Sequence, residues 1–146
     1  MKTITTILIS FLFLNLTAQD VAGDVAKLQQ LIDTEDYMQA LGLADKLIAK
    51  KIKEGLQNHA SKVYLLRGVA KYKLELDQDA IVDLKVSQSL DSKNSKTYLY
   101  IADIYYKMSS YSSSLENVIY YLEKVPDSVE GLLLKCKGEL EVEQYL

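Results

Sequence analysis

Apolar residues recur at steps of three and four along most of this chain, and short polar segments separate the runs. This spacing is typical of helices that bury one face. The first run ends at the polar segment 33–36, and its apolar stripe consists of Val25, Leu28, Leu31 and Ile32. The second run covers residues 37–54 and ends before Gly55, a residue type that is common just beyond a helix C-terminus. The pattern therefore predicts a pair of helices in the first part of the chain.

Two later stretches, residues 64–94 and 95–127, share one layout. Each contains two runs with helical spacing, joined by a short polar turn. One constant shift relates the two stretches, as in the pairs Gly68 and Ala102, Ala80 and Ser114, and Ser92 and Pro126. A self-similar period of this length indicates an array of helical repeats, a class of protein that usually binds other proteins or peptides.

The repeated pattern resembles the tetratricopeptide repeat (TPR). In that family helix A carries a large aromatic, a branched, a small and a second aromatic residue. The two copies place at these positions Tyr64, Arg67, Gly68 and Lys71, and then Tyr98, Ile101, Ala102 and Tyr105. Helix B carries a small residue, a bulky one four positions later and a terminal proline, represented by Ala80 with Leu84, and by Ser114 with Val118 and Pro126. The chain departs from the pattern at Arg67 and Lys71, and at Tyr121, where the family prefers a small residue.

The resemblance implies an all-α fold, in which antiparallel helix-turn-helix repeats stack as a short right-handed α-solenoid. Tyr37 and Ala40 match helix B of a first, divergent repeat, although the step from Ala40 to Ala80 is longer than the step from Ala80 to Ser114. An insertion at residues 55–58 or a longer helix accounts for the difference. The expected units are a signal peptide (1–18), a divergent helix pair (19–58), two repeats (59–94 and 95–128) and a closing segment (129–146).

The closing segment is expected to be a capping helix or half of a truncated repeat. Asp127 is placed to cap this helix, with Glu130 in the favoured third position. Its apolar face consists of Leu132, Leu133, Cys136 and Leu140. Cys136 falls at the small position of helix A, so we expect a buried thiol.

The N-terminus has the pattern of a secretory signal peptide: Lys2 precedes the apolar run 4–16, and cleavage is expected after Ala18. The alternative, a transmembrane anchor, requires about 20 apolar residues, whereas this run is interrupted by polar ones. The protein is therefore expected to be periplasmic or secreted, with no transmembrane span in the mature chain. Loss of Lys2 changes the formal net charge from −3 to −4, and the interspersed charges form no basic stripe for nucleic acid.

No catalytic or metal-binding constellation is apparent in the sequence. His59 is the only histidine and lacks co-ligands, so we expect a structural or solvated role for it. Asp77, Asp79 and Asp83 lack the glycine and glutamate of a calcium loop, and capping of helix B explains the first two better. Ser113, with Glu116, is expected to cap the following helix B. We therefore predict a protein that is not an enzyme and has no cofactor.

Seven tyrosines fall within one repeat. Tyr98, Tyr105 and Tyr111 stand at family positions that are usually buried, and are expected in the core. The family pattern does not assign a core position to the other four, which are Tyr100, Tyr106, Tyr120 and Tyr121.

The resemblance also implies that the A helices line a concave groove for a peptide or protein segment. The positions on or near its inner face are Lys62, Leu65, Val69, Tyr72, Lys73, Lys96, Leu99, Tyr100, Asp103, Tyr106, Lys107, Glu130, Leu133 and Lys137. Family members that clamp a terminal carboxylate use Lys, Arg and Asn where this chain has Leu65, Val69, Leu99 and Asp103.

An apolar centre with a rim of lysines instead suits an extended or helical segment with apolar anchors and some acidic character. The alternative is structural: the apolar faces pair with a second copy as a homo-oligomer, or pack within a cell-envelope assembly.

Overall fold

The computed structural model describes residues 21–51 and 59–144, and helices account for most of both ranges. Helical residues 21–33 precede α2 (Tyr37–Lys51), α3 (Ala60–Lys73), α4 (Asp77–Leu90), α5 (Lys96–Lys107), α6 (Tyr111–Lys124) and α7 (Val129–Gln144). The described residues contain no strand. The all-α prediction is confirmed.

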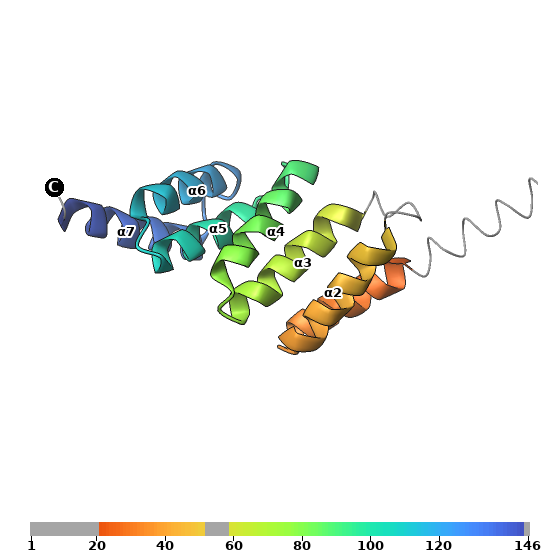
Figure 1. Cartoon of the computed structure of the whole chain (residues 1–146). Helices are drawn as coiled ribbons and strands as arrows, with labels where there is room; N and C mark the ends of the chain where they lie inside the picture. Colours follow the sequence, from red (N-terminus) through yellow and green to blue (C-terminus); the bar gives the residue numbers. More distant parts are fainter. Residues whose placement is uncertain (1–20, 52–58, 145–146) are drawn as a thin grey trace, which may run out of the picture.

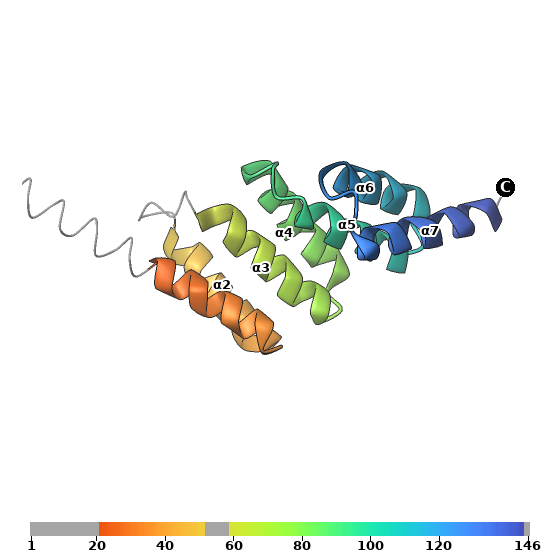
Figure 2. The same cartoon turned by 180° about the vertical axis from the view of Figure 1, so that it is seen from behind.

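The helices stack as an elongated array, with residues 21–33 near one end and α7 at the other (Figures 1 and 2). Each helix from α2 to α7 packs on the next one in the chain, and α3 with α5 and α5 with α7 are also in contact. This arrangement places α3, α5 and α7 side by side as the A helices, and α2, α4 and α6 as the B helices. It is the α-solenoid that the sequence pattern predicts.

The core is divided into layers between neighbouring helices. One layer joins residues 21–33 to α2 and α3 through Leu28, Ala44 and Val63, and the next joins α4 to α5 through Leu84, Ile101 and Ile104. The last layer joins α5, α6 and α7, and contains Leu99, Ala102, Val118, Tyr121 and Leu134. Tyr121 is therefore a core residue, although the family prefers a small residue there.

The helices of a repeat approach closely at the small positions. A Cβ atom added to Gly68 would lie 2.9 Å from Leu84 Cγ and 3.3 Å from the backbone oxygen of Ala80. At the matching position of the next repeat, the hydroxyl of Ser114 donates a hydrogen bond of 2.8 Å to the backbone oxygen of Ala102. Ala80 and Ser114 are fully buried, in agreement with their assignment as the small residues of helix B.

The turn between the helices of a pair has the same form three times. Glu35, Glu75 and Ser109 have φ values of 61, 62 and 58°, which is the left-handed region. The N–H of the following residue donates to a carbonyl five residues earlier, as from Leu76 to Lys71 at 2.9 Å. This is a Schellman ending without the usual glycine.

Three capping predictions are wrong in detail. The backbone N–H of Gly131 donates to Ser128 Oγ at 3.2 Å, so Ser128 rather than Asp127 caps α7. Ser113 lies inside the first turn of α6, because the preceding turn starts that helix at Tyr111. Asp77 and Asp79 lie in the first turn of α4 without capping it. Acidic residues there still suit the helix dipole.

The prediction of a buried Cys136 is also wrong, because its thiol is exposed. In α7 the buried positions are Gly131, Leu134 and Gly138, which pack against α5 and α6. Cys136 lies on the face that, in the earlier repeats, packs against helix B of the same repeat. Val129, Leu132, Leu133 and Leu140 are exposed with it.

The predicted signal peptide and the expected helix end at Gly55 lie outside the described residues. No helix in the described part of the chain is long and apolar enough to span a bilayer.

Candidate functional site

The A-helix positions predicted for the groove meet at a group of side chains from α3 and α5. The Tyr72 hydroxyl donates a hydrogen bond to Asp103 Oδ2. The Tyr72 ring also lies against Tyr100, with 6.1 Å between centroids and an interplanar angle of 59°. These contacts join two helices that follow each other as A helices of the array.

Two of the predicted lysines lie over the same tyrosine. The ammonium nitrogen of Lys107 is 4.5 Å from the centroid of the Tyr72 ring, and that of Lys73 is 5.5 Å away. Lys107 also lies 3.9 Å from Asp77 Oδ1. Cations at these distances are attracted by the electron-rich ring face. The result is a positively charged edge beside the aromatic group.

Tyr106 connects α5 to α7. Its hydroxyl lies 3.4 Å from Glu141 Oε1, and its ring centroid is 5.5 Å from that of Tyr111. Tyr72 and Tyr106 occupy the same position of successive repeats, so α3 and α5 each present a tyrosine hydroxyl to a carboxylate on the next A helix.

These tyrosines are held in the neutral form. Burial, and then the Asp103 hydrogen bond, raises the pKa of Tyr72 well above its ordinary value. Burial, and then the nearby Glu130, raises the pKa of Tyr100. Desolvation, followed by Glu141, raises the pKa of Tyr106. Near neutral pH all three hydroxyls are uncharged donors.

Two positions expected at the apolar centre of the groove are buried instead of accessible. Val69 is 3% exposed and Leu99 is 8% exposed, and Leu99 is covered by the layer that contains Leu134. Leu65 is partly buried and packs on the layer between α4 and α5. The accessible part of the predicted groove therefore consists mainly of tyrosine rings, Asp103 and lysines.

The other predicted positions are on α3, α5 and α7, and of these Glu130 lies near Tyr100. Lys62, Lys96, Leu133, Lys137 and Glu130 are exposed. Leu133 belongs to the exposed apolar face of α7 described above. The structure thus brings Tyr72, Lys73, Tyr100, Asp103 and Lys107 together.

The charged departures from the family pattern form an ion-pair cluster. Arg67 Nη2 lies 2.5 Å from Asp83 Oδ1, and Lys71 Nζ lies 2.8 Å from Asp83 Oδ2. Arg67 Nη1 also bonds to Asp45 of α2 at 2.8 Å. Asp83 is only 1% exposed, and these two cations offset the free-energy cost of burying its carboxylate. The cluster connects α2, α3 and α4.

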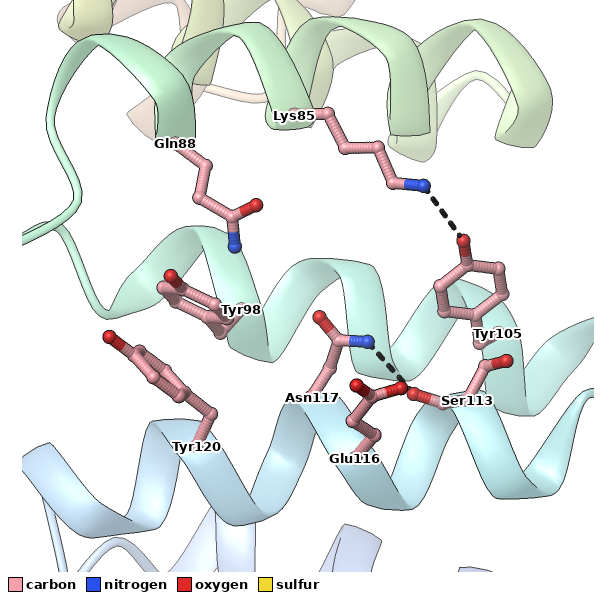
Figure 3. A pocket seen from close by; sticks show the side chains of 8 residues that line it. All are labelled: Lys85, Gln88, Tyr98, Tyr105, Ser113, Glu116, Asn117 and Tyr120. Carbon is pink, nitrogen blue, oxygen red and sulfur yellow. Dashed lines mark hydrogen bonds between the residues drawn. The ribbon is translucent and has the colours of Figure 1, made fainter.

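A cavity of about 330 Å³ lies between α4 and α6, over α5 (Figure 3). None of the predicted groove residues lines it. Its walls include Lys85, Gln88, Tyr98, Tyr105, Asn117 and Tyr120. Tyr98 and Tyr120 stack at 4.1 Å between centroids. Tyr98 and Tyr105, which were expected in the core, are partly buried and pack against core layers, and their accessible parts line this cavity.

The group around Tyr72 and the cavity have no cluster of metal ligands among the described residues. No family model and no curated protein sequence matches the chain. Solved structures do match its fold. The TPR domain of Arabidopsis OM64 superposes with a TM-score of 0.72 at 17% identity, covering 82% of this chain and 93% of that domain.

Two further matches contain a bound peptide. The second TPR domain of human RPAP3, in complex with the HSP70 peptide SGPTIEEVD, has a TM-score of 0.71 at 13% identity and covers 84% of this chain and 97% of its own. The Yersinia enterocolitica type III secretion chaperone SycD, in complex with a peptide of the translocator YopD, has a TM-score of 0.67 at 13% identity, with coverage of 86% and 92%. The chain therefore has the tetratricopeptide-repeat fold.

Proposed function

We propose that this protein is a non-catalytic scaffold that binds a peptide or protein segment along its A helices. The observation that carries the proposal is the group formed by Tyr72, Tyr100, Asp103 and Lys107, which presents aromatic surface, a carboxylate and a cation where α3 and α5 meet. Peptides bound to RPAP3 and SycD, which share this fold, support it.

The segment bound should be internal to its partner and not a chain end. Recognition of a terminal carboxylate needs cations at the inner positions, where this chain has Leu65, Val69, Leu99 and Asp103. Val69 and Leu99 are also buried. The accessible tyrosine rings suit apolar or aromatic anchors, and Lys73, Lys96 and Lys107 suit acidic residues beside those anchors.

Selection from a displayed library of random peptides on the full chain tests this proposal. Enriched peptides should combine an apolar or aromatic residue with acidic ones. Tyr106→Ala together with Lys107→Glu should weaken their binding by about tenfold or more, since aromatic anchors dominate interface energies. Lys93→Glu is the matched control, because Lys93 is exposed in the turn before α5. Selected peptides that bind the Tyr106 and Lys107 variant as tightly as the parent chain would overturn the proposal.

Export is part of the same proposal. It is supported by the apolar run 4–16 and the small residue Ala18. N-terminal sequencing of the protein recovered from a producing bacterium should begin at Gln19, in the periplasmic or secreted fraction. Recovery from the cytoplasm with the N-terminus intact would contradict it.

A second candidate function, self-association, is favoured by the exposed face of α7. Val129, Leu132, Leu133 and Leu140 are between 49% and 79% exposed. They lie on one side of the helix together with Cys136. Sedimentation velocity over a concentration series should then show a dimer that Leu132→Glu with Leu133→Lys converts to monomer. A monomer at all concentrations would remove this candidate.

A further inference from the structure

The cavity between α4 and α6 is separate from the A-helix group to which the proposed function refers. In Figure 3 its walls come from three helices, with Lys85 and Gln88 on α4, Tyr98 and Tyr105 on α5, and Asn117 and Tyr120 on α6. Its volume of about 330 Å³ lies within the range of small-molecule sites.

The equivalent place in the preceding repeat is crossed by ion pairs. There Arg67 reaches from α3 to Asp45 on α2 and to Asp83 on α4, at 2.8 and 2.5 Å. One repeat later Ile101 stands in place of Arg67, and it is buried in the layer between α4 and α5. No guanidinium is available at this position, so this repeat lacks the ion pairs that occupy the equivalent place in the preceding one.

The polar groups that line the cavity retain hydrogen-bonding capacity. Lys85 Nζ donates to the Tyr105 hydroxyl at 3.2 Å, and an ammonium has two further N–H donors. Asn117 Nδ2 donates to the backbone oxygen of Ser113 at 2.8 Å. Figure 3 shows the Asn117 side-chain oxygen turned away from that bond, on the side of Gln88 and Tyr98.

The lining combines donors, acceptors and aromatic surface without a net charge. Lys85 carries the positive charge and Glu116 the negative one. Gln88, whose side chain hydrogen-bonds to Tyr98, and Asn117 each keep capacity for a further bond, since an amide has two N–H donors and an acceptor oxygen. The ring of Tyr105 supplies an apolar wall, and the stacked pair Tyr98 and Tyr120 closes one end (Figure 3).

We propose that this cavity binds a neutral saccharide of one or two sugar units. Each sugar hydroxyl both donates and accepts hydrogen bonds, as this mixed lining requires, and the C–H groups of a sugar ring can pack on an aromatic wall. A ligand with charge of only one sign would leave either Lys85 or Glu116 opposed to a like charge. A peptide side-chain anchor would instead favour an apolar cavity.

Nuclear magnetic resonance of the full chain tests the proposal. The probes are maltose, cellobiose, lactose and diacetylchitobiose at millimolar concentration, and the readout is the ring signals of Tyr98, Tyr105 and Tyr120. At least one probe should shift these signals in a saturable way. Asn117→Ala and Gln88→Ala should each weaken that binding by about tenfold, the loss of a hydrogen bond to a polar ligand.

Gln30→Ala is the matched control, because Gln30 is exposed on the helical residues 21–33, away from the cavity. It should bind the probe as the parent chain does. The proposal is overturned if none of the four sugars shifts the tyrosine signals, or if Asn117→Ala and Gln88→Ala bind as well as the control. A capped Ala-Ala dipeptide that binds more tightly than any sugar would also overturn it. These variants leave peptide binding at Tyr106 and Lys107 intact, so the two proposals fail independently.

Discussion

The repeat formed by α3 and α4 and the repeat formed by α5 and α6 place different chemistry at the same positions of one fold. The first has Arg67, Lys71 and Asp83, which pair with one another. The second has Ile101, Tyr105 and Asn117 at the corresponding positions. The charged set pairs internally, whereas the tyrosine and asparagine of the second set line a cavity. The position in the repeat determines which side chains meet. The identity of these side chains determines whether they pair with one another.

The close contact within each repeat shows the same matching by size. Gly68 faces Leu84 in the first repeat, and Ala102 with Val118 occupies these positions in the second. The smaller residue on helix A accompanies the larger one on helix B. The helices of a repeat can therefore approach closely with either pair, whereas alanine opposite the larger leucine would overpack the contact.

Breaking the charged set should produce the largest effect. Asp83→Ala should lower the free energy of unfolding by about 3 kcal/mol, because Arg67 and Lys71 would be left largely buried and without the carboxylate between them. Urea denaturation followed by circular dichroism measures this. At the matching position, Asn117→Ala should cost less than about 1 kcal/mol.

The triple change Arg67→Ile, Lys71→Tyr and Asp83→Asn transfers the set of the second repeat to the first. It should restore part of the stability lost in Asp83→Ala, since the triple variant no longer leaves two buried cations without a carboxylate. A triple variant as unstable as Asp83→Ala alone would show that the two sets are not interchangeable.

Exchange of the size-matched pair should have the next largest effect. Gly68→Ala should cost about 1 to 3 kcal/mol, because the new Cβ would meet Leu84 and the backbone oxygen of Ala80. Adding Leu84→Val, which copies the second repeat, should recover part of this loss. A double-mutant cycle measured by thermal melting gives the coupling. If the effects of the two substitutions on stability are additive, the side chains at positions 68 and 84 do not contact each other.

The tyrosine links between A helices should differ in strength. Tyr72→Phe removes a hydroxyl that donates to Asp103, and should cost about 1 kcal/mol. Tyr106→Phe should have a smaller effect, because the hydroxyl lies as far as 3.4 Å from Glu141. Urea midpoints at neutral pH compare the two. Equal losses would contradict this ranking.

The Tyr72 link also predicts a dependence on pH. The folded chain holds the pKa of Tyr72 above the ordinary value of 10.0, so folding favours the protonated form. The stabilisation is complete below that ordinary value and is lost as the pH rises from it toward the folded pKa. Stability should therefore fall above about pH 10, and less steeply in Tyr72→Phe than in the parent chain.

The turns shared by the two repeats should give the smallest effects. Glu75→Gly and Ser109→Gly should each stabilise the fold by about 0.5 kcal/mol, because glycine adopts the left-handed conformation without a Cβ clash. Thermal melting should show similar gains for both variants. A loss of stability in either would mean that its side chain contributes more than the strain costs.

Much of the fold was predictable from the sequence because helical spacing and repeat register are local properties. The stripes predicted the helices, and the small residues Ala80 and Ser114 were correctly placed in close contact. The turns were harder to predict, since Glu35, Glu75 and Ser109 take a conformation that usually signals glycine. The caps of α4 and α6 were misassigned for the same reason, because these turns decide where those helices begin.

The candidate sites were predictable only in part. Register identified Tyr72, Tyr100 and Lys107 as groove positions, and the structure brings them together. The repeat register did not indicate that Val69 and Leu99 would be buried. The cavity was missed because its walls come from three helices, and Lys85 and Tyr120 are distant in sequence from each other. The high density of tyrosines in one repeat was the only available signal.

The sequence by itself determined the helices, their pairing and the small positions where paired helices touch, because each depends on residues within one or two turns. Only the tertiary structure decided which side chains are covered. Cys136 occupies a small position of helix A in the same register as Gly68 and Ala102, yet it is exposed. Gly68 and Ala102 are buried by α4 and α6, whereas Cys136 lies on the face of α7 opposite its contacts with α5 and α6. Burial depends on the helix that packs against a position, and register alone does not supply that helix.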